Sequence, residues 1–432
     1  MKKKGMTFGS IFIILLTIVV LASFFVLYAT FHSDADVTMR AIKMAGLISD
    51  TILGTTPQPE SAVKVTKVTL APQPTNIPVS PAPAAVPAKR EMAITLAGSV
   101  SFDSSISDSV YQKGQAICDY NDILSGIAPY VTGDACIAAL PQGLNAYGEN
   151  YTDHNAQPSA AMALRSAGFN MVVADGNELL AQGGQAVADT AEALYQNGLT
   201  ACGFNSGNAS QLQWLVNGQV KVALISYAES ISTKAMNTLQ TTAGQGMLTA
   251  YDLESLKDMI VTARMNGADF VIVYYRWNDV MVDQVTESMR KNMLEVTAAG
   301  ADVIIGTGVK RVLPAAWLST SDDNGITRRA LVLYSLGSLL TESREAYDIA
   351  GALVHIRLTE TPSGGVKIQQ MDYTPTYIWK QSIAGKEIYR VVASNEKPPT
   401  RMSTSQRGVM ERSLGRTNES LENTLILHDQ EE

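Results

Sequence analysis

Three polar turns carry side chains that could do chemistry, and each turn follows a similar apolar stretch. The stretches read AGFNMVVADG, NGADFVIVYYRWN and AGADVIIGTG, so each places a glycine and an apolar run before its turn. The turns bring carboxylates at Asp175, Glu178 and Asp279 and cations at Arg276 and Lys310. The cations can bind a carboxylate or a phosphate. The carboxylates can hold Mg, Mn or Ca, or the two sets of charges can pair internally.

The segments around these turns alternate between apolar strands and helical patterns. The sequence predicts strands over 92–100, 169–175, 199–204, 219–227, 268–277, 301–308, 330–340 and 352–360. It predicts helices over 158–168, 185–198, 252–267 and 283–300. This alternation predicts an α/β domain with buried sheets, because strands covered on both faces are apolar along their whole length. Ligands of α/β domains bind at the carboxyl ends of strands, which is where the three turns lie.

The composition argues against several classes of protein. The 432 residues include 33 Lys and Arg against 41 Asp and Glu, a net charge of −8. Nucleic acid is therefore not expected as a partner, because phosphate binding needs a basic surface. Hydrophobic residues make up 46% of the chain, unlike a disordered protein. Three cysteines are too few for a disulfide-built scaffold. The sequence allows one disulfide between Cys118 and Cys136. It equally allows buried free thiols at these positions and at Cys202.

An apolar run near the N-terminus predicts a membrane anchor. Residues 11–28 carry no charge and follow three lysines at 2–4. About 20 apolar residues cross a bilayer as a helix, and flanking lysines stay on the cytoplasmic side. We therefore expect a single-pass cell-membrane protein, anchored through residues 11–31, with a cytoplasmic N-terminus and its main domain outside the cytoplasm. A cleaved signal peptide is the alternative.

A proline-rich segment separates this anchor from the folded domain. Residues 56–90 hold half of the 16 prolines, which predicts an extended spacer. Beyond residue 393 the chain is polar and lacks sustained periodicity, so we expect a mostly disordered tail with at most a short helix. The expected organisation is a cytoplasmic stub and transmembrane anchor at 1–31, a stalk and linker at 32–90, an α/β domain at 91–393 and a polar tail at 394–432.

Five segments in this order resemble the bacterial capsule-synthesis protein CapA family, which is linked to poly-γ-glutamate. They are Gly98-Ser99 after the first strand, AGFNMVVADGNELLAQG (167–183), ADFVIVYYRWNDV (268–280), GADVIIGTGVKR (300–311) and YSLGSL (334–339). The resemblance covers most of 92–380. It implies a calcineurin-like metallophosphatase fold, an αββα sandwich in which Asp, Asn and His at strand ends hold two divalent metals.

The same segments depart from the family where its metal ligands stand. Ser99 takes the place of an Asp, and Glu178 takes the place of the His in an Asn-Asn-His triplet. Arg276 replaces the His before the retained tryptophan, while Thr307 and Lys310 replace the outer His residues of a His-His-x-His turn. Charged Arg and Lys side chains do not ligate metals. We therefore expect a degenerate site with no cofactor.

The candidate site combines these positions with their neighbours: Ser99, Asp103, Asp175, Asn177, Glu178, Arg276, Trp277, Asp279, Thr307 and Lys310. Asp103 either substitutes for the missing Asp or stabilises a turn. Trp277 either stacks on a ligand or packs in the core. His154, in the loop NYTDHNAQP, is expected to face solvent. The pocket as a whole is internally salt-bridged, binds an anion through Arg276 and Lys310, or keeps a residual metal.

The resemblance implies a role in the synthesis of a capsule or cell-envelope polymer of the poly-γ-glutamate type. We expect a non-catalytic protein that binds an anionic envelope polymer or organises its biosynthetic membrane complex. The alternative is a hydrolase that binds a divalent metal through a shifted ligand set of Asp103, Asp175, Asn177, Glu178 and Asp279. A structural spacer with an unused pocket is the third interpretation.

Overall fold

The computed structural model describes residues 90–425, apart from 175, 219, 242–243, 279–280, 322–324, 326, 344 and 384. The chain divides into two compact units, Met1–Ala84 and Ala85–Glu432, and every described residue belongs to the second. The predicted anchor, the predicted linker up to residue 89, Asp175 and Asp279 lie outside the described residues. Within the described part, no helix is long and apolar enough to cross a membrane.

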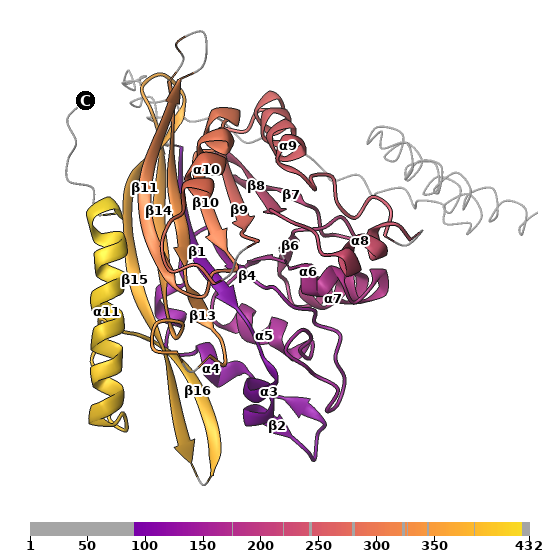
Figure 1. Ribbon diagram of the computed structural model, residues 1–432, viewed down its shortest axis with the longest axis vertical. Coiled ribbons are helices and arrows are strands. Elements are labelled where there is room, and N and C mark those ends of the chain that lie inside the picture. Colours follow the sequence, from indigo (N-terminus) through magenta and orange to yellow (C-terminus); the bar gives the residue numbers. More distant parts are fainter. Residues whose placement is uncertain are drawn as a thin grey trace, which may run out of the picture. The chain divides into compact units, whose positions relative to one another are not determined.

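An eight-stranded sheet forms one half of the domain (Figure 1). Its strands are, in spatial order, β16 (Lys386–Ala393), β15 (Val366–Ile383), β14 (Ala350–Glu360), β1 (Glu91–Val100), β4 (Ala135–Ala139), β5 (Met171–Val173) and β6 (Thr200–Cys202), with β13 (Ser338–Leu340) paired to β1. The strands β1, β4, β5 and β6 run parallel, whereas β14, β15 and β16 are antiparallel.

A six-stranded sheet forms the other half. Its order is β11 (Val312–Ser321), β12 (Thr327–Leu336), β10 (Val303–Thr307), β9 (Phe270–Arg276), β8 (Val220–Ala228) and β7 (Leu212–Asn217). The four central strands are parallel and the two edge strands are antiparallel. A separate two-stranded ribbon joins β2 (Tyr111–Gln112) to β3 (Ile117–Cys118).

The two sheets pack face to face, and helices cover both outer faces. Strand β9 illustrates why its sequence is apolar throughout: Ile272 points into the core between the sheets, while Val273 points into the core beneath the helices. Helices α9 (Leu253–Met265) and α10 (Glu287–Ala299) cover the six-stranded sheet. The other sheet is covered by α3 (Ser104–Val110), α4 (Asn121–Leu124), α5 (Ser159–Ser166), α6 (Asn177–Leu180) and α7 (Gly184–Gln196). The predicted α/β sandwich is confirmed.

Local signals in the sequence set the ends of these helices. Asp252 accepts a hydrogen bond from the backbone N–H of Ser255 (2.8 Å), and the Ser255 hydroxyl in turn accepts one from the Asp252 N–H. This reciprocal pair begins α9. Helix α10 ends at Gly300, whose φ of 116° is left-handed and suits glycine. Helix α9 leads into β9, and helix α10 leads into β10. Both strands carry candidate site residues at their carboxyl ends.

The expectation of a mostly disordered tail is wrong, because residues Thr404–Leu425 form a 22-residue helix, α11. Figure 1 shows α11 lying along β15 and β11. Its buried face repeats at helical spacing but includes polar side chains: Met410, Ser413, Thr417, Leu421 and Leu425. Because polar residues interrupt this face, the sequence shows little of the apolar periodicity that predicts a helix. The helix is held by packing, together with bonds such as Thr424 Oγ1 to the Ala315 carbonyl (3.0 Å).

Candidate functional site

The candidate residues gather where parallel strands of both sheets end. Strand β9 ends at Arg276, whose register partner on β10 is Thr307. Helix α6 begins at Asn177, just beyond β5 of the other sheet. On the far side, Ser99 pairs in register with Ser338, whose N–H donates to the Lys310 carbonyl (3.1 Å). We call this region the strand-end site; it comprises Ser99, Asp103, Asn177, Glu178, Arg276, Trp277, Thr307 and Lys310.

An ion pair between the two sheets lies in the strand-end site. Arg276 Nη2 lies 3.1 Å from Glu178 Oε1 and 3.3 Å from Oε2. The side chains are 11% and 31% exposed, so the pair is largely shielded from water. Arg276 belongs to β9 of the six-stranded sheet, and Glu178 to α6 above the eight-stranded sheet. Of the interpretations open from the sequence, this contact favours internal pairing at Arg276.

The Asn177 side chain makes a second bridge beside that ion pair. Its Nδ2 donates to the Ser230 carbonyl (2.8 Å), and its Oδ1 accepts from the Ser232 N–H (3.1 Å). Both ends of the amide are therefore engaged with the segment that follows β8. The Ser230 hydroxyl donates onward to Asn278 Oδ1 (2.6 Å), which ties this segment to the turn after β9.

Trp277 packs in the core. It is 3% exposed, and its ring lies 4.6 Å from the Tyr275 ring, measured between centroids. Its Nε1 donates to the Tyr334 carbonyl (2.8 Å). Thr307 is also buried, and its carbonyl accepts from the Trp277 N–H (3.1 Å). Of the two roles open from the sequence, core packing is the one observed.

Asp103 stabilises a turn across the site. Its carboxylate accepts from the Glu342 N–H (2.8 Å) and from Thr341 Oγ1 (3.4 Å). Burial raises the pKa of Asp103 to about 6, helped by the Glu342 and Asp153 charges and opposed by the Glu342 N–H bond and Lys310. Lys310 itself is exposed.

Ser99 has a buried hydroxyl oxygen with no hydrogen-bond partner among the described residues. It sits where the register of β1 against both β4 and β13 shifts. The strand therefore bends at this position, and a serine stands at the bend where the resemblance implies an aspartate. A single hydroxyl is too weak a donor set to hold a divalent metal.

Other residues singled out from the sequence lie apart from this chemistry. His154 is exposed in its loop, as predicted. The three cysteines are free and buried, so the possible Cys118–Cys136 bridge is absent. Sequence reasoning missed Glu229, which accepts from the Asn278 N–H (2.9 Å) and Asn292 Nδ2 (2.8 Å) and so fixes the turn after β9. The sequence could have indicated Glu229 as a candidate, because it is a charged residue directly after the apolar strand β8.

A family model described as "Bacterial capsule synthesis protein PGA_cap" matches residues 93–343. The chain belongs to this family. The matched range contains every residue of the strand-end site, whereas β14, β15, β16 and α11 lie beyond it. The family match thus ends after β13, although β14, β15 and β16 complete the same eight-stranded sheet.

Other comparisons add little to the family assignment. No curated protein matches the chain. NAD nucleotidase of Haemophilus influenzae is similar at 10% identity and a TM-score of 0.42, over 77% of this chain and 64% of that one. This chain therefore spans less than two thirds of the nucleotidase. A hypothetical protein from Thermus thermophilus is similar at 14% identity and a TM-score of 0.35, over 67% of this chain and all of that one.

The described residues of the strand-end site do not fit the two-metal centre that the resemblance implies. Asn177 has both ends of its amide engaged, and Glu178 is neutralised by a guanidinium. Arg276 and Lys310 do not ligate a metal in their charged forms. Among the residues that the structure describes, no three His, Cys, Asp or Glu side chains form a group suited to a metal ion.

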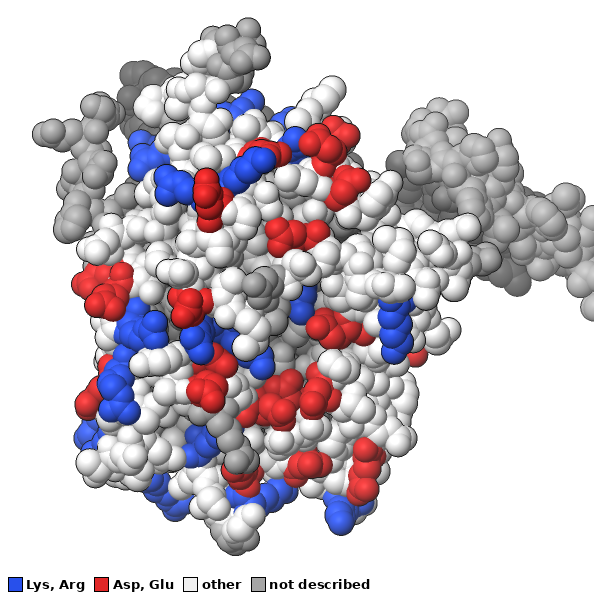
Figure 2. All heavy atoms as spheres, in the orientation of Figure 1, with Lys and Arg blue, Asp and Glu red and all other residues white. Residues whose placement is uncertain are grey.

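One face of the domain carries charges of both signs. On the face drawn in Figure 2, Lys and Arg side chains are interspersed with Asp and Glu. This face therefore offers no extended basic track of the kind that steers a long polyanion.

Proposed function

We propose that this PGA_cap protein is a non-catalytic scaffold in the synthesis of an anionic capsule or cell-envelope polymer. The observation that supports this most directly is the Arg276–Glu178 ion pair. In this pair, Arg276 neutralises the Glu178 carboxylate, which the alternative metal site needs as a ligand. Arg276 also stands where the resemblance implies a metal-binding histidine. On the face drawn in Figure 2 the charges of both signs are interspersed, which supports an organising role for that face in the biosynthetic complex over direct binding of the polymer.

The proposed placement is on the outer side of the cell membrane. The apolar run at 11–28 and the lysines before it support an anchor with a cytoplasmic N-terminus. Protease added to intact cells lacking an outer barrier should then digest the domain. Complete protection of the domain, with digestion only after lysis, contradicts this placement.

The experiment that tests a non-catalytic role replaces the ion pair by a neutral pair. Glu178→Gln combined with Arg276→Gln removes both charges while keeping side chains that can hydrogen-bond each other. Each variant is supplied to cells whose own copy is deleted, and the anionic surface polymer is quantified. A scaffold keeps its polymer yield in the double variant, because no metal ligand has been lost.

Controls separate a lost reaction from a lost fold. Arg276→Gln alone leaves the Glu178 charge unopposed in a shielded position, so we expect it to destabilise the domain. Protein abundance in the membrane fraction is measured for each variant. If the double variant is as abundant as the wild type but polymer synthesis stops, Glu178 takes part in catalysis and the proposal is wrong.

A further inference from the structure

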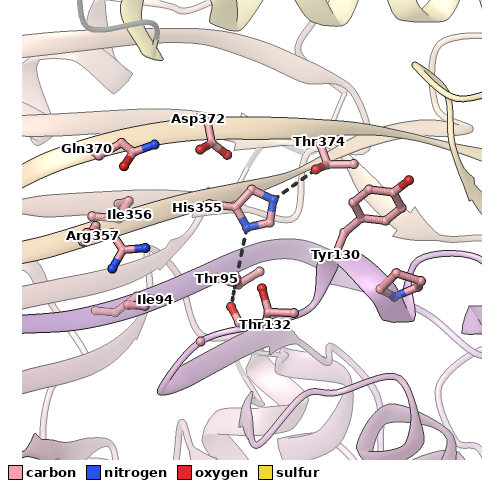
Figure 3. A pocket seen from close by; sticks show the side chains of 13 residues that line it. Ile94, Thr95, Tyr130, Thr132, His355, Ile356, Arg357, Gln370, Asp372 and Thr374 are labelled. Carbon is pink, nitrogen blue, oxygen red and sulfur yellow. Dashed lines mark hydrogen bonds between the residues drawn. The ribbon is translucent and has the colours of Figure 1, made fainter.

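An open cleft of about 480 Å³ lies on the outer face of the eight-stranded sheet (Figure 3). Strands β1, β14 and β15 form its floor, and residues 129–133 form one wall. Nearer the strand-end site the same face is covered, since Ala97 and its register partner Leu353 belong to the core beneath the helices. The cleft begins where that cover ends, and the outward side chains change from apolar to polar.

The wall of the cleft is fixed to its floor by hydrogen bonds. Thr95 Oγ1 donates to the Thr132 carbonyl (2.6 Å), and the Ala93 N–H donates to Asp134 Oδ2 (2.8 Å). At Gly133, with φ of 133°, a Cβ atom would lie 2.8 Å from the Ala93 carbonyl oxygen. The wall therefore approaches the strand too closely for a side chain there, and the cleft is formed before any ligand arrives.

His355 lies half-buried on the floor of the cleft, and each of its ring nitrogens lies within hydrogen-bond distance of a threonine hydroxyl. Thr95 uses its only hydroxyl proton on the Thr132 carbonyl, so it must accept from His355 Nδ1–H (3.1 Å). His355 Nε2 lies 3.0 Å from Thr374 Oγ1, and either atom can be the donor of this hydrogen bond. Burial lowers the pKa of His355, against the nearby Asp372 charge, which agrees with a neutral ring. His355 thus shapes the floor and leaves recognition to its neighbours.

Two opposite charges and an amide remain available in the cleft. On the floor, Asp372 lies opposite His355 and Gln370 lies opposite Arg357, so Arg357 and Asp372 are diagonal neighbours. Diagonal neighbours of this kind are about 7–8 Å apart at their backbones. Among the described residues, neither charged side chain forms an ion pair with the other or with any third group, and all three side chains are exposed. Figure 3 shows Asp372 near the His355 ring, with Gln370 and Arg357 farther along the strands on the same side of it.

We propose that this cleft binds a small zwitterion, an amino acid or a short peptide. Its carboxylate lies on the Arg357 guanidinium, which binds carboxylates through paired N–H donors. Its ammonium donates to the Asp372 carboxylate, and the Gln370 amide bonds the remaining polar atoms. A zwitterion neutralises both protein charges at once. A simple anion is repelled by the Asp372 carboxylate, and a simple cation is repelled by the Arg357 guanidinium. Arg357, Gln370 and Asp372 lie beyond the matched family range, whereas the β1 part of the floor and the wall at 129–133 lie within it.

The test is calorimetric titration of the full chain in detergent. The probes are alanine and alanylalanine, compared with N-acetylalanine, which lacks the ammonium, alaninamide, which lacks the carboxylate, and maltose, a neutral saccharide. We expect at least one of the two zwitterions to bind, and each singly charged analogue of alanine to bind about tenfold more weakly or not at all. The proposal is overturned if neither zwitterion binds, if N-acetylalanine or alaninamide binds as well as alanine, or if maltose is the tighter ligand.

Variants locate the binding in the cleft. Arg357→Gln and Asp372→Asn should each weaken zwitterion binding by about tenfold or more. Lys367→Gln, on the same strand β15 but outside the cleft, and Asp258→Asn, exposed on α9, are the matched controls and should bind as the wild type does. Because the cleft side chains are exposed, thermal unfolding should be unchanged in all four variants. Unaltered affinity in both cleft variants rules the site out, independently of any outcome for the proposed function.

Discussion

Replacing Asp103 by asparagine tests the electrostatics of the strand-end site. Burial, with help from the Glu342 and Asp153 charges, raises the pKa of Asp103 from 3.8 to about 6. A shift of about two units corresponds to about 3 kcal/mol between the two protonation states. The carboxylate is only 8% exposed, so solvent screens little of this energy. The ionised form is thus favoured in the unfolded chain relative to the folded one.

The sign of the pH dependence follows from this shift. Between pH 4 and pH 6 the unfolded chain has released the Asp103 proton while the folded protein still holds it. The folded state then binds more protons, so the contribution of Asp103 to the free energy of unfolding falls as pH rises through this window. The loss is complete above about pH 7 and absent below about pH 4.

Asp103→Asn should abolish this dependence, because asparagine does not ionise. Its Oδ1 can still accept from the Glu342 N–H, which Asp103 now binds at 2.8 Å. We expect the variant to be more stable than the wild type by up to about 3 kcal/mol at pH 8 and nearly equal to it at pH 4. Urea unfolding followed by circular dichroism at pH 4, 5, 6, 7 and 8 measures the difference.

The comparison has a matched control and a clear refutation. Asp258→Asn removes an exposed carboxylate on α9 that forms no hydrogen bond or ion pair with the described residues, and the stability of this variant should follow that of the wild type at every pH. Parallel curves for wild type and Asp103→Asn would show that Lys310 fully compensates the buried charge. A less stable variant at pH 8 would show that the carboxylate is a net stabilising group. Either result refutes the reasoning.

Two further predictions concern the core behind the site. Gly306→Ala places a Cβ atom 1.9 Å from the Tyr334 carbonyl oxygen and 2.3 Å from Trp277 Nε1, so we expect a loss of about 3 kcal/mol or more, or failure to fold. Gly114→Ala, with nothing within 4 Å, is the control, and equal stability of the two variants in urea unfolding contradicts the packing argument. Burial raises the pKa of all three cysteine thiols, so Ellman's reagent should react slowly with the native protein and rapidly with three thiols after unfolding in denaturant. A single reactive thiol after unfolding would instead indicate a disulfide.

The central parallel strands could be predicted from the sequence because both of their faces are buried. The predicted strand at 268–277 corresponds to β9 at Phe270–Arg276, and 301–308 corresponds to β10 at Val303–Thr307. Each is an uninterrupted apolar run that ends in a glycine or a charged residue. The predicted helix at 252–267 likewise corresponds to α9, whose Asp252 cap is visible in the sequence.

The sequence did not predict the C-terminal strand and helix, because their buried faces lack a regular apolar pattern. Strand β15 (Val366–Ile383) has exposed, half-buried and buried positions in an irregular order and contains Pro375, so neither alternation nor an apolar run marks it. Helix α11 buries Ser413 and Thr417 among its apolar residues. In both cases tertiary packing decides the structure, and the sequence alone carries too weak a pattern.

For the strand-end site, the sequence predicted which residues lie in the turns but not which residues they contact. The sequence placed Glu178 and Arg276 in turns after different strands and left pairing, anion binding and metal binding open. Choosing among them needs the order of strands in two sheets, which spacing along the chain does not encode. The role of Trp277 was open for the same reason, since its partner Tyr334 is 57 residues away.

Polar contacts at the strand ends fix one sheet against the other. Apolar packing between sheets is non-directional, so it tolerates small sliding of one sheet over the other. Directional bonds do not: Glu178 pairs with Arg276, Asn177 bonds the segment after β8, and the Tyr274 hydroxyl on β9 reaches the Ala97 carbonyl on β1 (3.2 Å). Each contact joins an element of the eight-stranded sheet to one of the six-stranded sheet. These side chains tie the two sheets together in the region where the family resemblance implies shared metals.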